Sequence, residues 1–223
     1  MKDESYLARF VKSHRSGLIL TALVIEMLVS PAADYHPHIG AVLAAFVWLV
    51  IVAAANYLAS RELVRWVVLP LAGVWAFARL LEAFAGGHLY SHLAPLAGLA
   101  LSCSILWGIF ERAHRVPRSP GTALAESFIA YLVIAIAFAQ LYWILNRVLA
   151  QPFNQVIPTQ DISTLLYFSM VTISSVGYGF IAPVNPYVRM VAAFESVTGL
   201  FYIAVVVARL VSSYREFEHR ATE

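Results

Sequence analysis

The stretch Ser175-Val176-Gly177-Tyr178-Gly179 lies near the C-terminus, between two apolar segments. Its glycines alternate with larger residues, and glycine adopts positive φ at little steric cost. This spacing predicts a strand whose backbone alternates in handedness, so that successive carbonyl groups point the same way. Several copies of such a strand around one axis would present stacked rings of carbonyl oxygens, with the Ser175 hydroxyl at the inner end.

The segment before this strand is typical of a short helix. It runs from Asp161 to Ile173 and is rich in apolar and aromatic residues. Asp161 stands at its start, where an acidic residue can cap the first turn and complement the helix dipole. The C-terminal end of the helix, which carries the negative end of the dipole, would then face the strand and any cation beside it.

Residues 124–212 resemble the tetrameric potassium channels. An outer helix, a short pore helix, the S-V-G-Y-G strand and a long inner helix carrying Gly199 follow one another in that family's order. The resemblance implies a homotetramer in which each chain supplies one selectivity-filter strand. It also implies K⁺ as the permeant ion, with no cofactor, and K⁺ ligands at Ser175, Val176, Gly177 and Tyr178, followed by Gly179.

The composition is that of a multi-pass membrane protein. Of the 223 residues, 61% are hydrophobic and 13% are charged, which excludes an ordinary soluble core. Because a helix needs about 20 apolar residues to cross a bilayer, we expect an all-α protein with six crossings. These lie at about 17–33, 38–58, 64–84, 93–110, 123–148 and 188–212, and the pore helix and filter re-enter the membrane before the last.

Basic residues orient the chain in the cell membrane. Twelve of the fifteen flank the expected crossings on one side, and they are Lys2, Arg9, Lys12, Arg15, Arg61, Arg65, Arg112, Arg115, Arg118, Arg209, Arg215 and Arg220. Basic residues concentrate on the cytoplasmic side of membrane proteins, so both termini are expected there, with the filter facing outward. The net charge of +2 is accounted for by these flanking residues, and no nucleic-acid partner is expected.

Two modules are expected along the chain. Residues 1–116 form a four-helix bundle, residues 117–121 a cytoplasmic linker, and residues 122–223 the pore domain. The bundle has the layout of a voltage sensor, but the fourth crossing carries no Arg or Lys to act as a gating charge. We therefore interpret it as structural and expect weak voltage dependence. We expect no cytoplasmic ligand-binding domain, and a separate regulatory subunit remains open.

The surroundings of the filter depart from the commonest channel pattern. Phe180 follows G-Y-G, as in inward rectifiers, but the two positions that form an ion pair there are the apolar Val171 and Ile181. Packing and polar contacts must then support the filter. The expected supporting residues are Tyr167, Phe168, Thr172, Ser174, Phe180 and Glu195.

Glu195 and Gly199 lie one turn apart on the inner helix. We hypothesise that Glu195 hydrogen-bonds the pore helix, through Thr172 or Ser174, in place of the missing ion pair. A lipid-facing or helix-facing Glu195 is the alternative. Gly199 can serve either as a bend or as a close-packing position. The residues expected to line the cavity and gate are Gly199, Leu200, Ile203, Val207 and Val211.

Other functions fit the sequence less well. A less selective monovalent cation channel is the nearest alternative, because Ser175 replaces the usual Thr and Phe180 alters the outer support. An ion-transport subunit that depends on a separate partner is another, although single-chain transporters usually carry four pore loops. No enzyme is expected, because no catalytic pair lies at membrane depth. Four histidines are expected on the outer face beside lipid headgroups, without a metal: His36, His38, His88 and His92.

Overall fold

The computed structural model describes residues 15–35, 64–85, 93–115, 120–158 and 161–221. In these ranges the chain forms helices and no strand longer than an isolated bridge. The helices are α2 (Arg15–Tyr35), a short π-helix η1 (Val64–Val68) that leads into α5 (Leu69–Ala85), α6 (Leu93–Arg115), α7 (Pro120–Val148), α8 (Ile162–Ile173) and α9 (Pro186–Ala221). The expected all-α class is confirmed for this part of the chain.

Three of the described helices are long and apolar enough to cross a membrane. They cover Leu93–Glu111, Gly121–Val148 and Pro186–Arg209, where the sequence predicts the fourth, fifth and sixth crossings. Helices α2 and η1–α5 occupy the places of the first and third expected crossings. The second expected crossing, at 38–58, and the four histidines lie outside the described residues.

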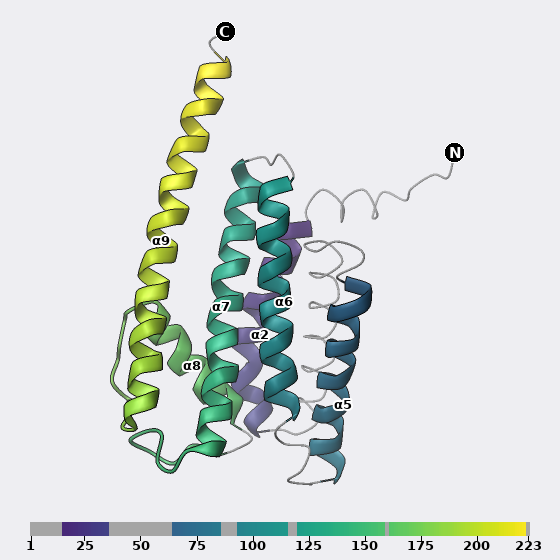
Figure 1. Cartoon of the computed structure of the whole chain (residues 1–223), viewed down its shortest axis with the longest axis vertical. Helices are drawn as coiled ribbons and strands as arrows, with labels where there is room; N and C mark the ends of the chain where they lie inside the picture. The colour runs from purple at the N-terminus through teal and green to yellow at the C-terminus, as the bar shows by residue number, and fades with distance from the viewer. Residues whose placement is uncertain (1–14, 36–63, 86–92, 116–119, 159–160, 222–223) are drawn as a thin grey trace, which may run out of the picture.

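The long helices run side by side, and α9 stands at one edge of the molecule (Figure 1). Helix α7 is the centre of the packing, since it contacts α2, α6, α8 and α9. The short α8 lies between α7 and the lower part of α9, and the α8–α9 loop runs from the end of α8 to the start of α9 (Figure 1). Both loops that flank α8 therefore reach the same end of the molecule, where α9 begins.

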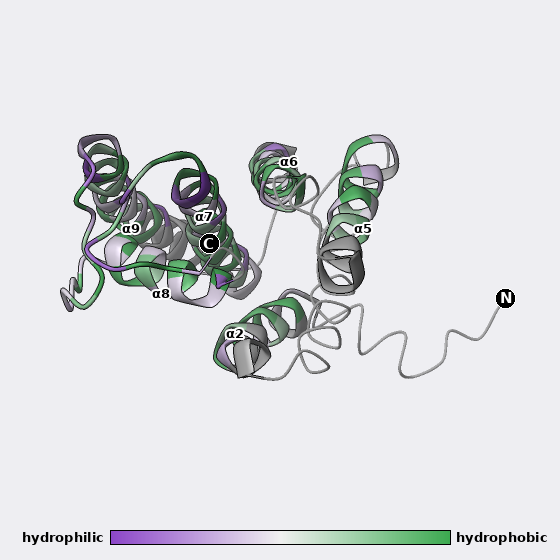
Figure 2. Ribbon diagram, turned by 90° about the horizontal axis from the view of Figure 1, so that it is seen from below, coloured by the Kyte–Doolittle hydropathy of each residue, from purple (hydrophilic) through white to green (hydrophobic). Residues whose placement is uncertain are grey.

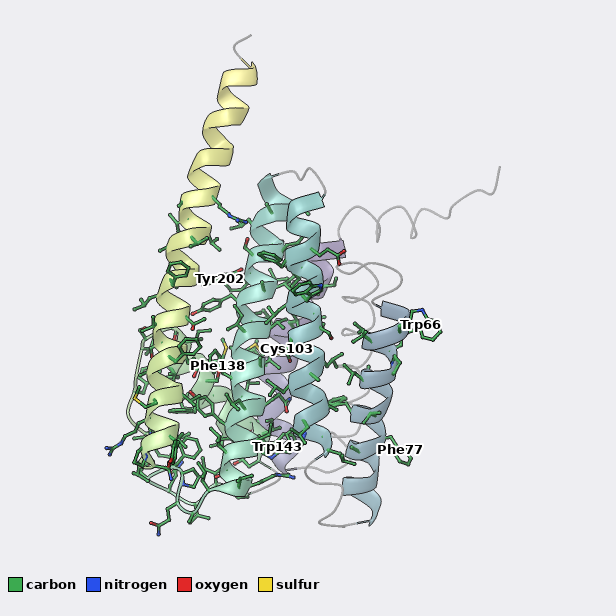
Figure 3. The ribbon with its side chains drawn as sticks, in the orientation of Figure 1. Trp66, Phe77, Cys103, Phe138, Trp143 and Tyr202 are labelled. Carbon is green, nitrogen blue, oxygen red and sulfur yellow. The ribbon has the colours of Figure 1, made fainter. Side chains whose placement is uncertain are left out.

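Hydrophobic residues cover most of the helix surfaces, whereas much of the hydrophilic colour lies in the loops around α7, α8 and α9 (Figure 2). Trp66 of η1 and Phe77 of α5 project away from the bundle and are 74% and 63% exposed (Figure 3). Because large apolar side chains on the outside of helices are stable in lipid, this surface fits a membrane protein.

A buried aromatic cluster fixes α8 against α7. The rings of Tyr142, Phe153 and Phe168 meet edge to face, with centroids 4.9–6.1 Å apart. Edge-to-face contact suits the quadrupoles of aromatic rings. The cluster joins α7, the α7–α8 loop and α8, and it therefore sets the position from which the α8–α9 loop begins.

Candidate functional site: the loop between α8 and α9

Helix α8 begins where the sequence predicts. Asp161 is its N-cap, and its carboxylate accepts hydrogen bonds from the backbone N–H of Thr164 at 2.9 Å and from the Thr164 hydroxyl at 2.7 Å. The helix ends at Ile173, and Ser174 is the C-cap. The helix predicted here is therefore confirmed in position and length, and its C-terminal carbonyls adjoin the glycine-containing strand.

The strand alternates in backbone handedness. φ is +58° at Ser175, +59° at Gly177 and +79° at Gly179, while Val176 and Tyr178 between them are not among the positive-φ residues. Positive φ at the two glycines confirms the prediction from their spacing. The same conformation at Ser175 was not predicted, and it is uncommon for a residue with a Cβ.

The amide groups of the strand turn back toward α8. The N–H of Ser175 donates to Thr172 O at 2.9 Å, and the N–H groups of Val176 and Gly177 donate to Val171 O at 3.0 and 3.3 Å. No peptide bond among the described residues is cis, and in a trans peptide the C=O points opposite to the N–H. The carbonyls of residues 174–176 therefore point away from α8.

The segment that follows the strand is held by Asn154 of the α7–α8 loop. Its side-chain oxygen accepts from the N–H of Ala182 at 2.9 Å, and its side-chain nitrogen lies 3.4 Å from Phe180 O. Its own N–H donates to Ala182 O at 2.8 Å. Sequence reasoning missed this residue, because an asparagine in a polar loop carries no local signal of a partner 26–28 residues away.

Replacing Asn154 with Ala should lower the stability of the outer loop. Two side-chain hydrogen bonds are lost, at about 0.5–1.5 kcal/mol each, while the backbone pair with Ala182 remains. We expect a lower midpoint of thermal unfolding in detergent for the Asn154→Ala variant. Gln155→Ala is the matched control, and equal midpoints for the two variants would show that Asn154 does not hold the loop.

Glu195 contacts the pore helix, as hypothesised, but through a different residue. Its side chain is fully buried, and Oε1 lies 2.5 Å from Ser169 Oγ of α8. Tyr142 of α7 donates to Oε2 at 2.7 Å. The expected partners bond elsewhere, since the hydroxyls of Thr172 and Ser174 donate to carbonyls of α8 itself. Ser169 and Tyr142 are thus the residues that sequence reasoning missed.

Gly199 packs against the end of α8. A Cβ at this position would overlap the backbone oxygen of Ile173 and lie 2.8 Å from Ile173 Cγ1. Of the two roles considered for Gly199, the close-packing role is the one that this contact supports. The inner helix therefore touches the residue just before the C-cap of the pore helix, two positions before the strand begins.

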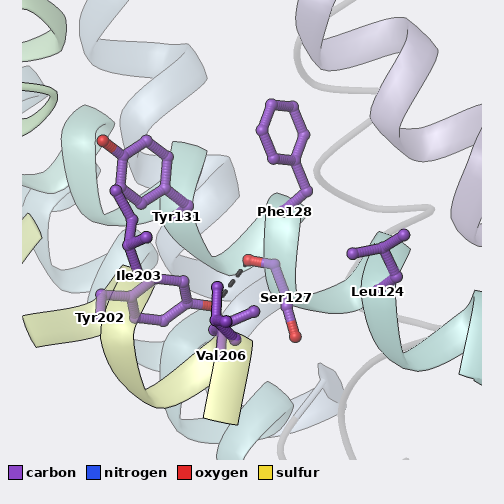
Figure 4. A pocket seen from close by; sticks show the side chains of 8 residues that line it. Leu124, Ser127, Phe128, Tyr131, Tyr202, Ile203 and Val206 are labelled. Carbon is purple, nitrogen blue, oxygen red and sulfur yellow. Dashed lines mark hydrogen bonds between the residues drawn. The ribbon is translucent and has the colours of Figure 1, made fainter. Parts of the chain in front are cut away.

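Beyond Gly199, toward the C-terminus of α9, an apolar pocket of about 190 Å³ lies between α7 and α9 (Figure 4). The Tyr202 hydroxyl bridges the two helices by donating to Ser127 O at 2.6 Å. Ile203 and Val207 line this pocket, and their side chains are about half exposed. Leu200 is 58% exposed, and the side chain of Val211 lies outside the described residues. The role of these four in a central cavity stays a prediction.

The other predicted supporting residues fall into two groups. Phe168 is buried in the aromatic cluster, where it supports α8 from behind. Tyr167 and Phe180 are exposed, at 42% and 69%, and their role as supports stays a prediction. Every residue from Ser174 to Gly179 is also exposed.

A comparison with protein families identifies this region. A family model described as an ion channel matches residues 127–216, which include most of α7, all of α8, the glycine-containing strand and most of α9. No curated protein matches the chain. The match indicates similarity to ion channels, and it lies within residues 122–223, where the sequence predicts the pore domain.

Proposed function

We propose that the protein is a potassium-selective channel, in which four copies surround one pore and K⁺ passes passively down its gradient. The observation that carries this proposal is the backbone at 174–179. Alternate residues have positive φ, the amides turn toward α8, and the carbonyls of 174–176 point away from α8. Rows of carbonyl oxygens of this kind can replace the hydration shell of K⁺.

Exposure of the strand supports an assembly around it. In one chain Val176 and Tyr178 are 53% and 73% exposed, and the loop that holds them lies at the edge of the described helices, beside α9 (Figure 1). Irregular backbone at membrane depth is stable only when protein or a water-filled path covers it, not lipid. Since one chain supplies one strand and the carbonyl ring needs four, we infer a homotetramer.

Helix α9 points to the same assembly. Only 11% of its membrane-length segment is buried, compared with 50% for those of α6 and α7. Its exposed apolar side chains include Met190, Phe194, Val197 and Phe201 along one face, and Ile203 on the opposite face. Neighbouring copies and lipid together would cover this surface. The inner helix of a pore, which faces both an axis and adjacent subunits, has this exposure in an isolated chain.

The selectivity proposal depends on the strand's sequence as well as its backbone. The complete V-G-Y-G keeps the carbonyl rings that favour K⁺, so we place K⁺ at Ser175, Val176, Gly177 and Tyr178. A less selective cation channel is the second candidate, and Ser175 in place of Thr favours it. We further propose a cell-membrane location with both termini cytoplasmic, on the distribution of basic residues, and a six-crossing subunit with a structural bundle at 1–116.

The assembly is tested on the full chain purified in mild detergent and reconstituted in liposomes. We expect the mass of four chains and K⁺ flux that Ba²⁺, a divalent ion close to K⁺ in size, blocks. A monomeric mass with flux retained would contradict the tetramer. Tetramers that conduct no cation in any condition would contradict the channel.

A further inference from the structure

An acid, a hydroxyl and a backbone carbonyl meet in a row behind the filter. Ser169 Oγ lies 2.5 Å from Glu195 Oε1 and 2.7 Å from the backbone oxygen of Ala135 in α7. On the other side of the carboxyl group, the Tyr142 hydroxyl donates to Oε2 at 2.7 Å. The side chains of Glu195, Ser169 and Tyr142 are all fully buried, so water does not complete the row.

Counting hydrogens decides the charge of Glu195. A serine hydroxyl has one hydrogen to donate, and a backbone carbonyl has none. An ionised Glu195 would also have no hydrogen to donate. Ser169 Oγ would then have a single hydrogen for its two contacts, with Glu195 Oε1 and with Ala135 O, and one contact would contain no hydrogen. If Oε1 carries a proton, Glu195 donates to Ser169 and Ser169 donates to Ala135 O. Each contact then contains one hydrogen.

The surroundings of Glu195 agree with this count. The groups that face it are Tyr142 and Tyr131 of α7 and Ser169 of α8, and none of these three carries a positive charge. A buried carboxylate without an opposite charge is costly, whereas a neutral acid with hydrogen-bonded oxygens is not.

The position of the row connects it to the filter. Ser169 lies on the same helix as Val171 and Thr172, two and three residues before them, and these two residues provide the carbonyls that hold the amides of 175–177. Glu195 and Ser169 thus tie α9 to α8 just before this point, while Ala135 and Tyr142 tie both to α7. A displacement of Ser169 would move the carbonyls that fix the strand.

We propose that Glu195 is a proton-binding site and that its proton must be bound for the filter to keep its conducting shape. This inference rests on the proposed function. Release of the proton to water leaves Ser169 with one hydrogen for two acceptors. The contact with Glu195 or with Ala135 then breaks, α8 shifts, and the amides of 175–177 lose their partners. The ligand of this site is H⁺ alone.

The test is K⁺ flux from liposomes that contain the full chain, measured over a range of pH. Flux of the unmodified protein should fall as pH rises, by about tenfold or more per pH unit beyond the point of release, as for one titrating proton per chain. Glu195→Gln should conduct at every pH without this fall, because its amide donates to Ser169 and accepts from Tyr142 as the neutral acid does. If Glu195 had a purely structural role, Glu195→Gln would have the same pH profile of flux as the unmodified protein.

Two further variants separate the parts of the row. Tyr142→Phe removes a donor that stabilises the ionised form, so its fall in flux should move to higher pH. Ser169→Ala removes the hydroxyl that joins Glu195 to Ala135 O, so it should conduct less and lose the pH dependence.

Infrared difference spectra of protein transferred from low to high pH should show the C=O stretch of a protonated carboxyl group disappear, and Glu195→Gln should lack that band. This readout needs no conduction.

Some results would overturn the proposal. These are flux of the unmodified protein that does not depend on pH, a pH profile retained in Glu195→Gln, or an infrared band unchanged by that substitution. Absence of K⁺ flux at every pH would overturn the proposed function and the coupling to conduction, and the infrared band would still decide whether the proton is present.

Discussion

Replacing Gly199 with Ala should abolish K⁺ conduction. The new Cβ overlaps the backbone oxygen of Ile173, and a backbone atom at the end of a packed helix cannot move aside as a flexible side chain can. Overpacking of this kind costs about 1–3 kcal/mol, and the displacement falls at the end of α8, where Val171 and Thr172 hold the strand. We expect tetramer yield to fall and flux to disappear from the tetramers that form.

Gly73→Ala is the matched control for this substitution. Gly73 lies within α5, and a Cβ there meets no atom within 4 Å. Alanine also has a higher helix propensity than glycine, so the control should fold and conduct normally. If Gly199→Ala conducts like Gly73→Ala, the contact between α9 and Ile173 does not position the filter.

Replacing Gly177 with Ala should stop conduction without unfolding the protein. φ at Gly177 is +59°, and a Cβ there meets no atom within 4 Å. The cost is therefore one of backbone strain alone, about 1–2 kcal/mol per chain for an L-residue in the left-handed region. Rotation of a peptide group would relieve this strain, and the rotation removes a carbonyl from its row.

Thermal unfolding and K⁺ flux together measure this effect. The Gly177→Ala variant should unfold at nearly the temperature of the unmodified protein and lose its flux. Gly121→Ala, at the start of α7 and also without a neighbour for the Cβ, should alter neither. Normal flux through Gly177→Ala would show that positive φ at this position is not needed for conduction.

The sequence alone predicts the parts of this site that depend on local spacing. Helix α8 follows from an acidic cap and twelve apolar and hydroxyl residues, and positive φ at Gly177 and Gly179 follows from their alternation. The three membrane-length helices follow from apolar runs. In each case the signal lies within the element that it specifies.

What could not be predicted depends on how the helices are rotated against one another. Glu195 was expected to reach α8, but its choice of Ser169 over Thr172 depends on which face of α8 turns toward α9. Tyr142 and Asn154 come from other elements, 53 and 28 residues from the groups that they bond. Positive φ at Ser175 follows from the bonds between the strand and the end of α8.

The central claim is that the carbonyls of this strand select K⁺. The reversal potential of current through the reconstituted full chain, in planar bilayers with K⁺ on one side and Na⁺ on the other, tests it most directly. We predict a reversal potential displaced strongly toward the K⁺ equilibrium potential, in the sense that K⁺ carries the current. A reversal potential near zero, with equal passage of Na⁺ and K⁺, would contradict the claim.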